Sequence, residues 1–478
     1  MRWNKLKSTE EQIAKEAIFG SLPILAEERL YGFADALLLL SGYCIATWSY
    51  TQGAYLATLV GFRQLLIGAF AGALFMLCIY QLPVILSVRY GIDIWIWLKA
   101  VFGGRGIMIM TVAIILVNYP WYAVCADLFA SSMVRLAALL GLELSGGIRM
   151  VLGLACVLLG TFLALRGPGT MTRVTRILVP LLLAVGALVI VVGFRSVPFH
   201  AIWDYRPAVQ NGSEAISYLI SIEANFAFVI TLVGGMAGVP RLVRSERAGF
   251  WAGVLGQGLS GSFFVVIGAV MAIAMNYATG EMVEDPTQML AILAAPAMAL
   301  CSLLLVAFAN IGTQAVGAYL YGVMLKSAFR TASYRGLLFL LAVYACGLVL
   351  WGGVVENFGS FLTLGACVYA PLAALLFTDF FLVRRQRLAL RSAFDLPGHN
   401  AYRYHSGFNW VGLLCVAAGI ALSLAVYDPV SGTVRCAALF VLTPTGLSFV
   451  GTGVLYWLLS QIPPIRRYLL QDREEITV

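Results

Sequence analysis

The sequence has little charge. Of its 478 residues, 11% are charged and 61% are hydrophobic, whereas soluble domains average about 25% charged and about 45–50% apolar residues. Many stretches contain about 20 predominantly apolar residues, the length of helix that crosses about 30 Å of hydrocarbon. This shortage of charge excludes an ordinary soluble domain. It predicts an all-α, polytopic membrane protein built as one bundle, because a helix satisfies its own backbone hydrogen bonds in lipid.

Histidine is also scarce, and the three histidines all fall in predicted loops: His200, His399 and His405. The nine cysteines are scattered, nearly all within apolar runs and without metal-ligand spacing, and buried cysteine behaves as a small apolar residue. We therefore expect no disulfide, no metal site and no cofactor. A membrane-embedded enzyme is a remote alternative because no nucleophile–base pair is evident. A channel is another, because no pore loop is evident.

Apolar runs predict twelve spanning segments, and their approximate ranges are 33–58, 64–88, 106–134, 150–166, 177–194, 217–239, 249–275, 289–325, 336–353, 357–380, 408–427 and 437–461. The eighth is long enough to contain a tilted helix and an extramembrane turn. Of the 31 basic residues, six lie on one side of the predicted membrane and the others lie on the opposite side with the two tails. The positive-inside rule then places both termini in the cytoplasm. It also explains the net charge of +8 without a nucleic-acid partner.

Four segments contain polar and helix-breaking residues, which are informative because a polar group in hydrocarbon is costly unless protein, water or a ligand satisfies it. The clusters are "ATWSYTQGAY" at 46–55, "NYPWYAVCADLF" at 118–129, "IEANFAFVITLVGGMAG" at 222–238 and "ANIGTQAVGAY" at 309–319. They fall on segments one, three, six and eight. Two five-span inverted repeats would pair segment one with six and three with eight. Transporters of that kind bind substrate where broken helices meet near the midplane.

Each cluster also has a purely structural explanation. Glycine permits close helix packing, proline kinks a helix, and aromatic, amide and acidic side chains pack, bond neighbouring helices or stay hydrated. The residues with this alternative are Pro120, Trp121, Asp127, Glu223, Gly234, Gly235, Asn310 and Gln314. The joint pattern favours a central site. We expect the first segment to unwind between about Ala46 and Gly53, so that freed backbone and neighbouring side chains line that site.

The segment "ENFGSFLTLGACVYAPLAALLFTDFFLVRRQRL" at 355–388 carries the most specific motif. It has a Phe-Leu start, Pro371 in mid-span and an Asp-aromatic-Phe-x-Val-Arg-Arg end at 379–385. Weaker similarities lie in "LPILAEERLYGFADALLLLSG", "RYGIDIWIWLKAVFGGRG" and "YRYHSGFNWVGLLCVAAGI". On these motifs the chain resembles the nucleobase–cation symporters, especially the purine and cytosine permease branch, from about residue 20 to 460.

The resemblance implies a leucine-transporter-like fold, with ten core helices in two inverted repeats at 33–380 and two additional helices at 408–461. The cytoplasmic parts would be a tail at 1–32, a loop at 381–407 and a tail at 462–478. It also implies import of a purine, cytosine or hydantoin- or allantoin-like ring by cation symport with alternating access. We expect a monomer in the cell membrane, whose partners are this small heterocycle and the lipid bilayer. Another small solute, such as an amino acid or a thiamin-like pyrimidine, is the alternative.

The resemblance and the polar clusters together select site residues. The family stacks an aromatic residue of its third helix on the ring, and Trp121 holds that position. An indole suits the flat face of a base, and amide side chains suit its edge. The candidate substrate-binding residues are Trp121, Gln52, Trp48, Cys125, Gly234, Gly235, Asn310 and Gln314. Cys125 stands where well-known members have Gln or Asn.

The candidate cation-binding residues are Ala46, Ser49, Thr313 and Glu223. Sodium-driven relatives carry paired hydroxyls on the eighth helix, where this chain has Phe308 and Ala309. A proton is therefore the default coupling ion, with sodium as the alternative. In the proton case, Glu223 is the candidate carrier.

Overall fold

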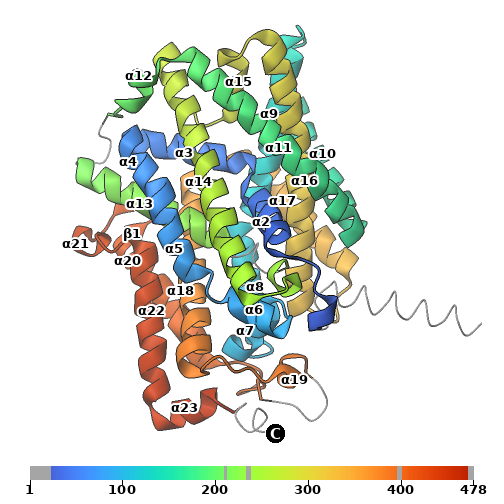
Figure 1. The fold of residues 1–478 in the computed structure, drawn as a ribbon, viewed down its shortest axis with the longest axis vertical. Helices are drawn as coiled ribbons and strands as arrows, with labels where there is room; N and C mark the ends of the chain where they lie inside the picture. Colours follow the sequence, from blue (N-terminus) through green and yellow to red (C-terminus); the bar gives the residue numbers. More distant parts are fainter. Residues whose placement is uncertain (1–22, 209–212, 233–237, 396–400, 472–478) are drawn as a thin grey trace, which may run out of the picture.

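The computed structural model describes residues 23–208, 213–232, 238–395 and 401–471, which form one helical bundle (Figure 1). Its longer helices are α2 (Phe33–Cys44), α3 (Thr47–Leu59), α8 (Gly106–Asn118), α9 (Pro120–Leu139), α10 (Gly146–Leu165), α11 (Pro168–Ser196), α13 (Glu214–Thr231), α14 (Glu246–Thr279), α16 (Pro296–Ala328), α17 (Tyr334–Trp351), α18 (Phe358–Phe377), α20 (Trp410–Val426) and α22 (Pro444–Gln461). The described residues also contain one two-stranded antiparallel hairpin, β1 (Tyr427–Asp428) with β2 (Thr433–Val434).

Shorter helical pieces connect or extend these rods. They are η1 (Ala26–Glu28), α4 (Phe62–Ile67), the π-helical η2 (Gly68–Gly72), α5 (Ala73–Tyr80), α6 (Val84–Tyr90), α7 (Ile94–Phe102), α12 (Phe199–Trp203), η4 (Pro240–Leu242), α15 (Pro286–Leu293), the π-helical η5 (Thr378–Val383), α19 (Leu390–Ala393), α21 (Ala437–Phe440) and α23 (Pro463–Leu469). Among the described residues, nine helical segments are long and apolar enough to cross a membrane, and two more helices are apolar but shorter. Each predicted span contains helix, but the count of twelve stays a prediction.

The first predicted span is broken, over a shorter stretch than the sequence suggested. α2 ends at Cys44, Ile45 and Ala46 are non-helical, and α3 begins at Thr47. The predicted unwinding from Ala46 to Gly53 is therefore wrong in extent, because helix resumes at once. The Ser49 hydroxyl donates to the Cys44 carbonyl oxygen at 2.6 Å, which satisfies an acceptor that the break would otherwise leave free.

Close packing explains why Gly53 lies within a helix. α3 crosses α14, the long helix in the middle of the bundle (Figure 1). A Cβ on Gly53 would lie 1.8 Å from the Val265 carbonyl oxygen, and one on Gly268 would lie 2.1 Å from the Tyr50 carbonyl oxygen. The two backbones touch here, so the glycines serve helix packing at this crossing.

Two more predicted spans are interrupted. The third consists of α8 and α9, which meet at Tyr119 and Pro120; Tyr119 keeps helical dihedrals, so the proline only kinks the rod. In the sixth, α13 ends at Thr231, eight residues before the predicted end of that span. The predicted eighth range holds α15, a turn at Ala294 and Ala295, and α16, as its length indicated.

The two C-terminal helices α20 and α22 pack against α18 and against each other (Figure 1). A buried ion pair joins the parts of this region: Arg384 Nε donates to Asp379 Oδ2 at 2.7 Å, and both side chains are almost fully excluded from solvent. The Tyr456 hydroxyl of α22 donates to Asp379 Oδ1 at 2.8 Å. The specific sequence motif at 379–385 thus ties η5, which follows α18, to α22.

Candidate functional site

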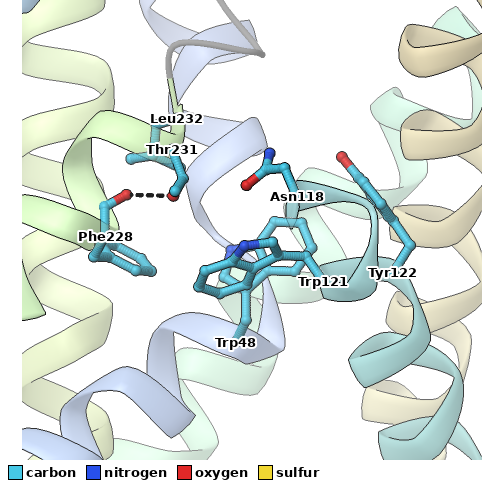
Figure 2. A pocket seen from close by; sticks show the side chains of 7 residues that line it. All are labelled: Trp48, Asn118, Trp121, Tyr122, Phe228, Thr231 and Leu232. Atoms are coloured by element: carbon cyan, nitrogen blue, oxygen red, sulfur yellow. Dashed lines mark hydrogen bonds between the residues drawn. The ribbon is translucent and has the colours of Figure 1, made fainter. Parts of the chain in front are cut away.

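A small cavity of about 10 Å³, the volume that one water molecule needs, lies where the interrupted helices meet (Figure 2). Seven residues line it: Trp48, Asn118, Trp121, Tyr122, Phe228, Thr231 and Leu232. Each interruption places part of the lining. Trp48 lies in the first turn of α3 after the break, Asn118 to Tyr122 surround the α8–α9 kink, and Phe228 to Leu232 form the end of α13.

Aromatic rings form most of the wall. The ring centroids of Trp48 and Trp121 lie 5.6 Å apart at an interplanar angle of 79°. Trp121 also contacts Phe228 at 6.0 Å and 61°, and Phe358 at 5.1 Å and 80°. Edge-to-face contact at these separations is the favoured arrangement of aromatic pairs. In each pair the edge of one ring lies on the face of the other, so these side chains form a closely packed and uncharged wall.

A glycine on the opposite helix sets the position of Tyr122. A Cβ on Gly317 of α16 would lie 1.7 Å from Cε1 of the Tyr122 ring. The ring therefore rests directly on the backbone of α16. Tyr122 also meets Trp48 edge-on, with centroids 5.6 Å apart, so it contacts both α3 and α16.

Few polar groups face this cavity, and none of its lining side chains is charged. The Thr231 hydroxyl donates to the Phe228 carbonyl oxygen at 2.8 Å (Figure 2). Three buried polar atoms of the lining have no partner among the described residues: Trp48 Nε1, Trp121 Nε1 and Asn118 Oδ1. A buried polar atom without a partner is costly, so these atoms are available for a ligand.

The predicted substrate-binding residues separate into three groups. Trp48 and Trp121 line the cavity. Gln52 and Cys125 are fully buried outside its lining, and Gln52 Nε2 donates to the Ala224 carbonyl oxygen at 3.2 Å. Gly234 and Gly235 lie outside the described residues.

The predicted pair on α16 contacts neighbouring helices. The Thr47 hydroxyl donates to Asn310 Oδ1 at 2.5 Å, and Asn310 Nδ2 donates to the Val306 carbonyl oxygen at 3.0 Å. Gln314 packs on α10, since a Cβ on Gly160 would lie 2.4 Å from its Cγ. Neither amide is among the residues that line the cavity.

The predicted cation-binding residues do not form one cluster of bonded groups. Ala46 is the extended residue at the break, and Ser49 bonds back to Cys44. The Thr313 hydroxyl donates within its own helix to the Ala309 carbonyl oxygen at 3.0 Å. Glu223 is fully buried and accepts two hydrogen bonds from Thr445 at the start of α22. Phe308 is 57% exposed on the surface of the bundle.

Sequence reasoning missed several lining residues, namely Asn118, Tyr122, Phe228, Thr231 and Leu232. All of them lie inside the polar clusters of segments three and six. Their position next to Pro120, or just before the glycines of segment six, is the signal that could have found them. An interruption leaves room in the helix packing, and the side chains next to it border that room.

Comparison with known proteins identifies the chain. A family model described as a permease for cytosine/purines, uracil, thiamine and allantoin matches residues 23–445. The chain belongs to this permease family. A curated relative, the hydantoin permease of Microbacterium maritypicum, is 38% identical over 85 residues, which make up 18% of this permease and 17% of that relative. The match thus spans less than two thirds of the relative's length.

Solved transporters share the permease's fold. Mhp1, a nucleobase-cation-symport-1 family transporter, is 19% identical in a closed conformation with bromovinylhydantoin bound, with a TM-score of 0.71 over 95% of this chain and 96% of that one. Its inward-facing conformation is also 19% identical, with a TM-score of 0.75 over 93% and 92%. A substrate-bound, outward-open Na+-coupled sialic acid symporter is 11% identical, with a TM-score of 0.52 over 90% and 96%.

These comparisons confirm the predicted family and fold class. The permease is an all-α, polytopic membrane protein with a leucine-transporter-like fold. The roles of the individual site residues and the identity of the coupling ion stay predictions.

Proposed function

We propose that this permease imports an uncharged heterocycle of the nucleobase or hydantoin kind together with a cation, by alternating access. It does so as a monomer in the cell membrane, with both termini in the cytoplasm and without chemical catalysis. The family match supports the substrate class. So do the name of the hydantoin permease and the bromovinylhydantoin bound to Mhp1.

The observation that carries the proposal is the neutral aromatic cavity at the junction of three interrupted helices. An indole face stacks well on a flat ring, and such stacking contributes about 1–3 kcal/mol per base in nucleic-acid complexes. An amino acid would bring two charges, and buried charges need partners. The lining supplies no charged side chain, and residues 233–237, which follow it in sequence as VGGMA, carry none either. The neutral lining thus favours an uncharged ring, because an amino acid would need helix ends or the coupling ion as partners for its charges.

Transport by purified permease in proteoliposomes tests this function. Uptake of hydantoin, uracil, cytosine, hypoxanthine, allantoin and thiamine would be measured with sodium and proton gradients imposed separately. We expect saturable uptake of at least one neutral ring, driven by the proton gradient. Uptake driven by sodium alone would overturn the choice of ion but keep the function. No uptake of any ring under either gradient would overturn the function.

Trp121→Ala tests the cavity itself. Loss of stacking worth about 1–3 kcal/mol should raise the apparent KM about 5- to 150-fold, because each 1.4 kcal/mol is tenfold in affinity. Trp251→Ala is the matched control, since Trp251 is 41% exposed on α14 and outside the cavity lining; its KM should stay within about twofold. Equal KM values in the two variants would contradict a binding role for the cavity.

A further inference from the structure

Asn118 is placed to read the edge of a ring. It is the last residue of α8, directly before the kink, and only 4% of it is exposed. It lines the same cavity as the two indoles. Figure 2 shows its side chain between Thr231 on one side and Tyr122 on the other.

Neighbouring helices fix the orientation of its amide group. Asn118 Nδ2 donates to the Tyr321 hydroxyl of α16. That hydroxyl lies 3.5 Å from the hydroxyl of Tyr369 on α18, so it can accept from Asn118 and donate its own proton to Tyr369. With its N–H group held in this way, Asn118 turns its oxygen away from α16. Asn118 Oδ1 is buried and has no partner among the described residues.

A glycine leaves space beside this oxygen. A Cβ on Gly365 of α18 would lie 3.6 Å from Asn118 Oδ1 and 3.0 Å from Thr231 Cγ2. Any side chain there would narrow the gap between α8 and the end of α13. The glycine therefore keeps side-chain atoms of α18 away from an acceptor that is buried and otherwise unsatisfied.

We infer that Asn118 selects the substrate of this permease by accepting a hydrogen bond from a ring N–H. The inference rests on the proposed function and names its substrate class: a cyclic amide or imide, with an N–H next to a carbonyl. The N–H satisfies Asn118 Oδ1, and the carbonyl accepts from an indole N–H of Trp48 or Trp121, both of which also have no partner among the described residues. A site that offers a buried acceptor rejects analogues lacking the donor, because the acceptor is then left unpaired.

The test compares ring N–H with ring N–CH3 in matched probes. Uptake of hydantoin and uracil would be competed with each parent compound and with its singly N-methylated forms. Wild-type permease should bind at least one N-methylated form about tenfold or more weakly than its parent. In Asn118→Ala the ratio of the affinity for the parent compound to that for its N-methylated form should fall to about twofold. The acceptor is gone, and the N-methyl group of the ligand fits the space that the amide leaves. Asn276→Ala, which removes an amide outside the cavity lining, should keep the wild-type ratio.

Tyr321→Phe is the second variant, and it leaves the cavity lining unchanged. It releases the Asn118 amide, so the ratio should drop to a value between those of wild type and Asn118→Ala, even if Asn118→Ala does not fold. If wild-type permease transports these rings but tolerates every N-methylation, the inference is wrong and the proposed function stands. The inference is also wrong if Asn118→Ala keeps the wild-type ratio. If only Tyr321→Phe folds, a wild-type ratio in that variant has the same consequence. If wild type transports no ring, the proposed function itself fails.

Discussion

Gln314 shows how residue type and residue role can separate. It is fully buried, and neither its Oε1 nor its Nε2 has a partner among the described residues. Its side chain packs on Gly160 of α10, and Gln314 is not among the residues that line the cavity. Amide chemistry made it a candidate for reading a ring edge, but the surroundings of that amide are those of a helix interface.

Gln314→Met therefore should not weaken transport. Replacing an unpaired buried amide with an apolar side chain of similar length removes a desolvation cost of about 1–3 kcal/mol. We expect an unchanged or higher melting temperature in detergent and an apparent KM within about twofold of wild type. Gln257→Met is the matched control: it removes the oxygen that accepts from buried Gln81 Nε2 at 2.5 Å, leaves that donor unpaired and should lower the melting temperature. A clear rise in KM for Gln314→Met would support the edge-reading role predicted from sequence.

The two tryptophans and the two amides of α16 show what sequence can predict for single residues. Trp48 and Trp121 were found because an indole beside a helix interruption is conspicuous in an apolar span, and both line the cavity. Asn310 and Gln314 lie four residues apart and so share a helical face. The spacing does not say which neighbour covers that face. Here Thr47 and Gly160 do, and both belong to helices far away in sequence.

At the scale of elements, interruptions were predicted more reliably than their extent. The residue pattern indicated interruptions in segments one and six. The break between α2 and α3 lies in the first, and α13 ends at Thr231 in the sixth, just before residues 233–237, which lie outside the described residues. The predicted unwound stretch was too long because glycine has two structural roles in a membrane span. It lowers the stability of a helix, and it allows a neighbouring helix to pack closely. Gly53 serves the second role, close packing, and this is evident only from its contact with α14.

Gly53→Ala tests the α3–α14 crossing. The added methyl group would lie 1.8 Å from the Val265 carbonyl oxygen, and backbone atoms cannot move aside as a flexible side chain can. Overpacking of this kind costs about 1–3 kcal/mol or more, so the melting temperature and the yield of folded permease should fall. Gly347→Ala is the matched control, because that helical glycine of α17 has nothing within 4 Å of an added Cβ. It should be neutral or slightly stabilising, since alanine favours helix; equal effects of the two changes would contradict the packing role.

At the scale of the whole molecule, α22, the second of the two C-terminal helices, binds two buried acids. Asp379 pairs with Arg384 and accepts from Tyr456 of α22. Glu223 of α13 accepts from the Thr445 backbone N–H at 3.0 Å and from the Thr445 hydroxyl at 2.6 Å. These residues are 222 positions apart, so sequence could predict two extra helices but could not show what they hold. The carboxylate of Glu223 occupies the N-terminus of α22, where a helix has unsatisfied N–H groups and favours negative charge.

Glu223→Gln separates an anchoring role from the predicted proton-carrying role. With both carboxylate oxygens bonded to Thr445, we expect an anchor. The change should replace one acceptor oxygen with an NH2 group and leave one Thr445 donor unpaired, which costs about 1–3 kcal/mol; the melting temperature should fall while gradient-driven uptake persists. Thr445→Val removes one donor and keeps the acid, so it should also destabilise, and the double variant should cost less than the two single effects added together, because the groups are in contact. A proton carrier would behave differently: Glu223→Gln alone would abolish uptake driven by the proton gradient and keep counterflow, while Thr445→Val would keep both. That result would show that Glu223 carries the proton and that α22 only holds it in position.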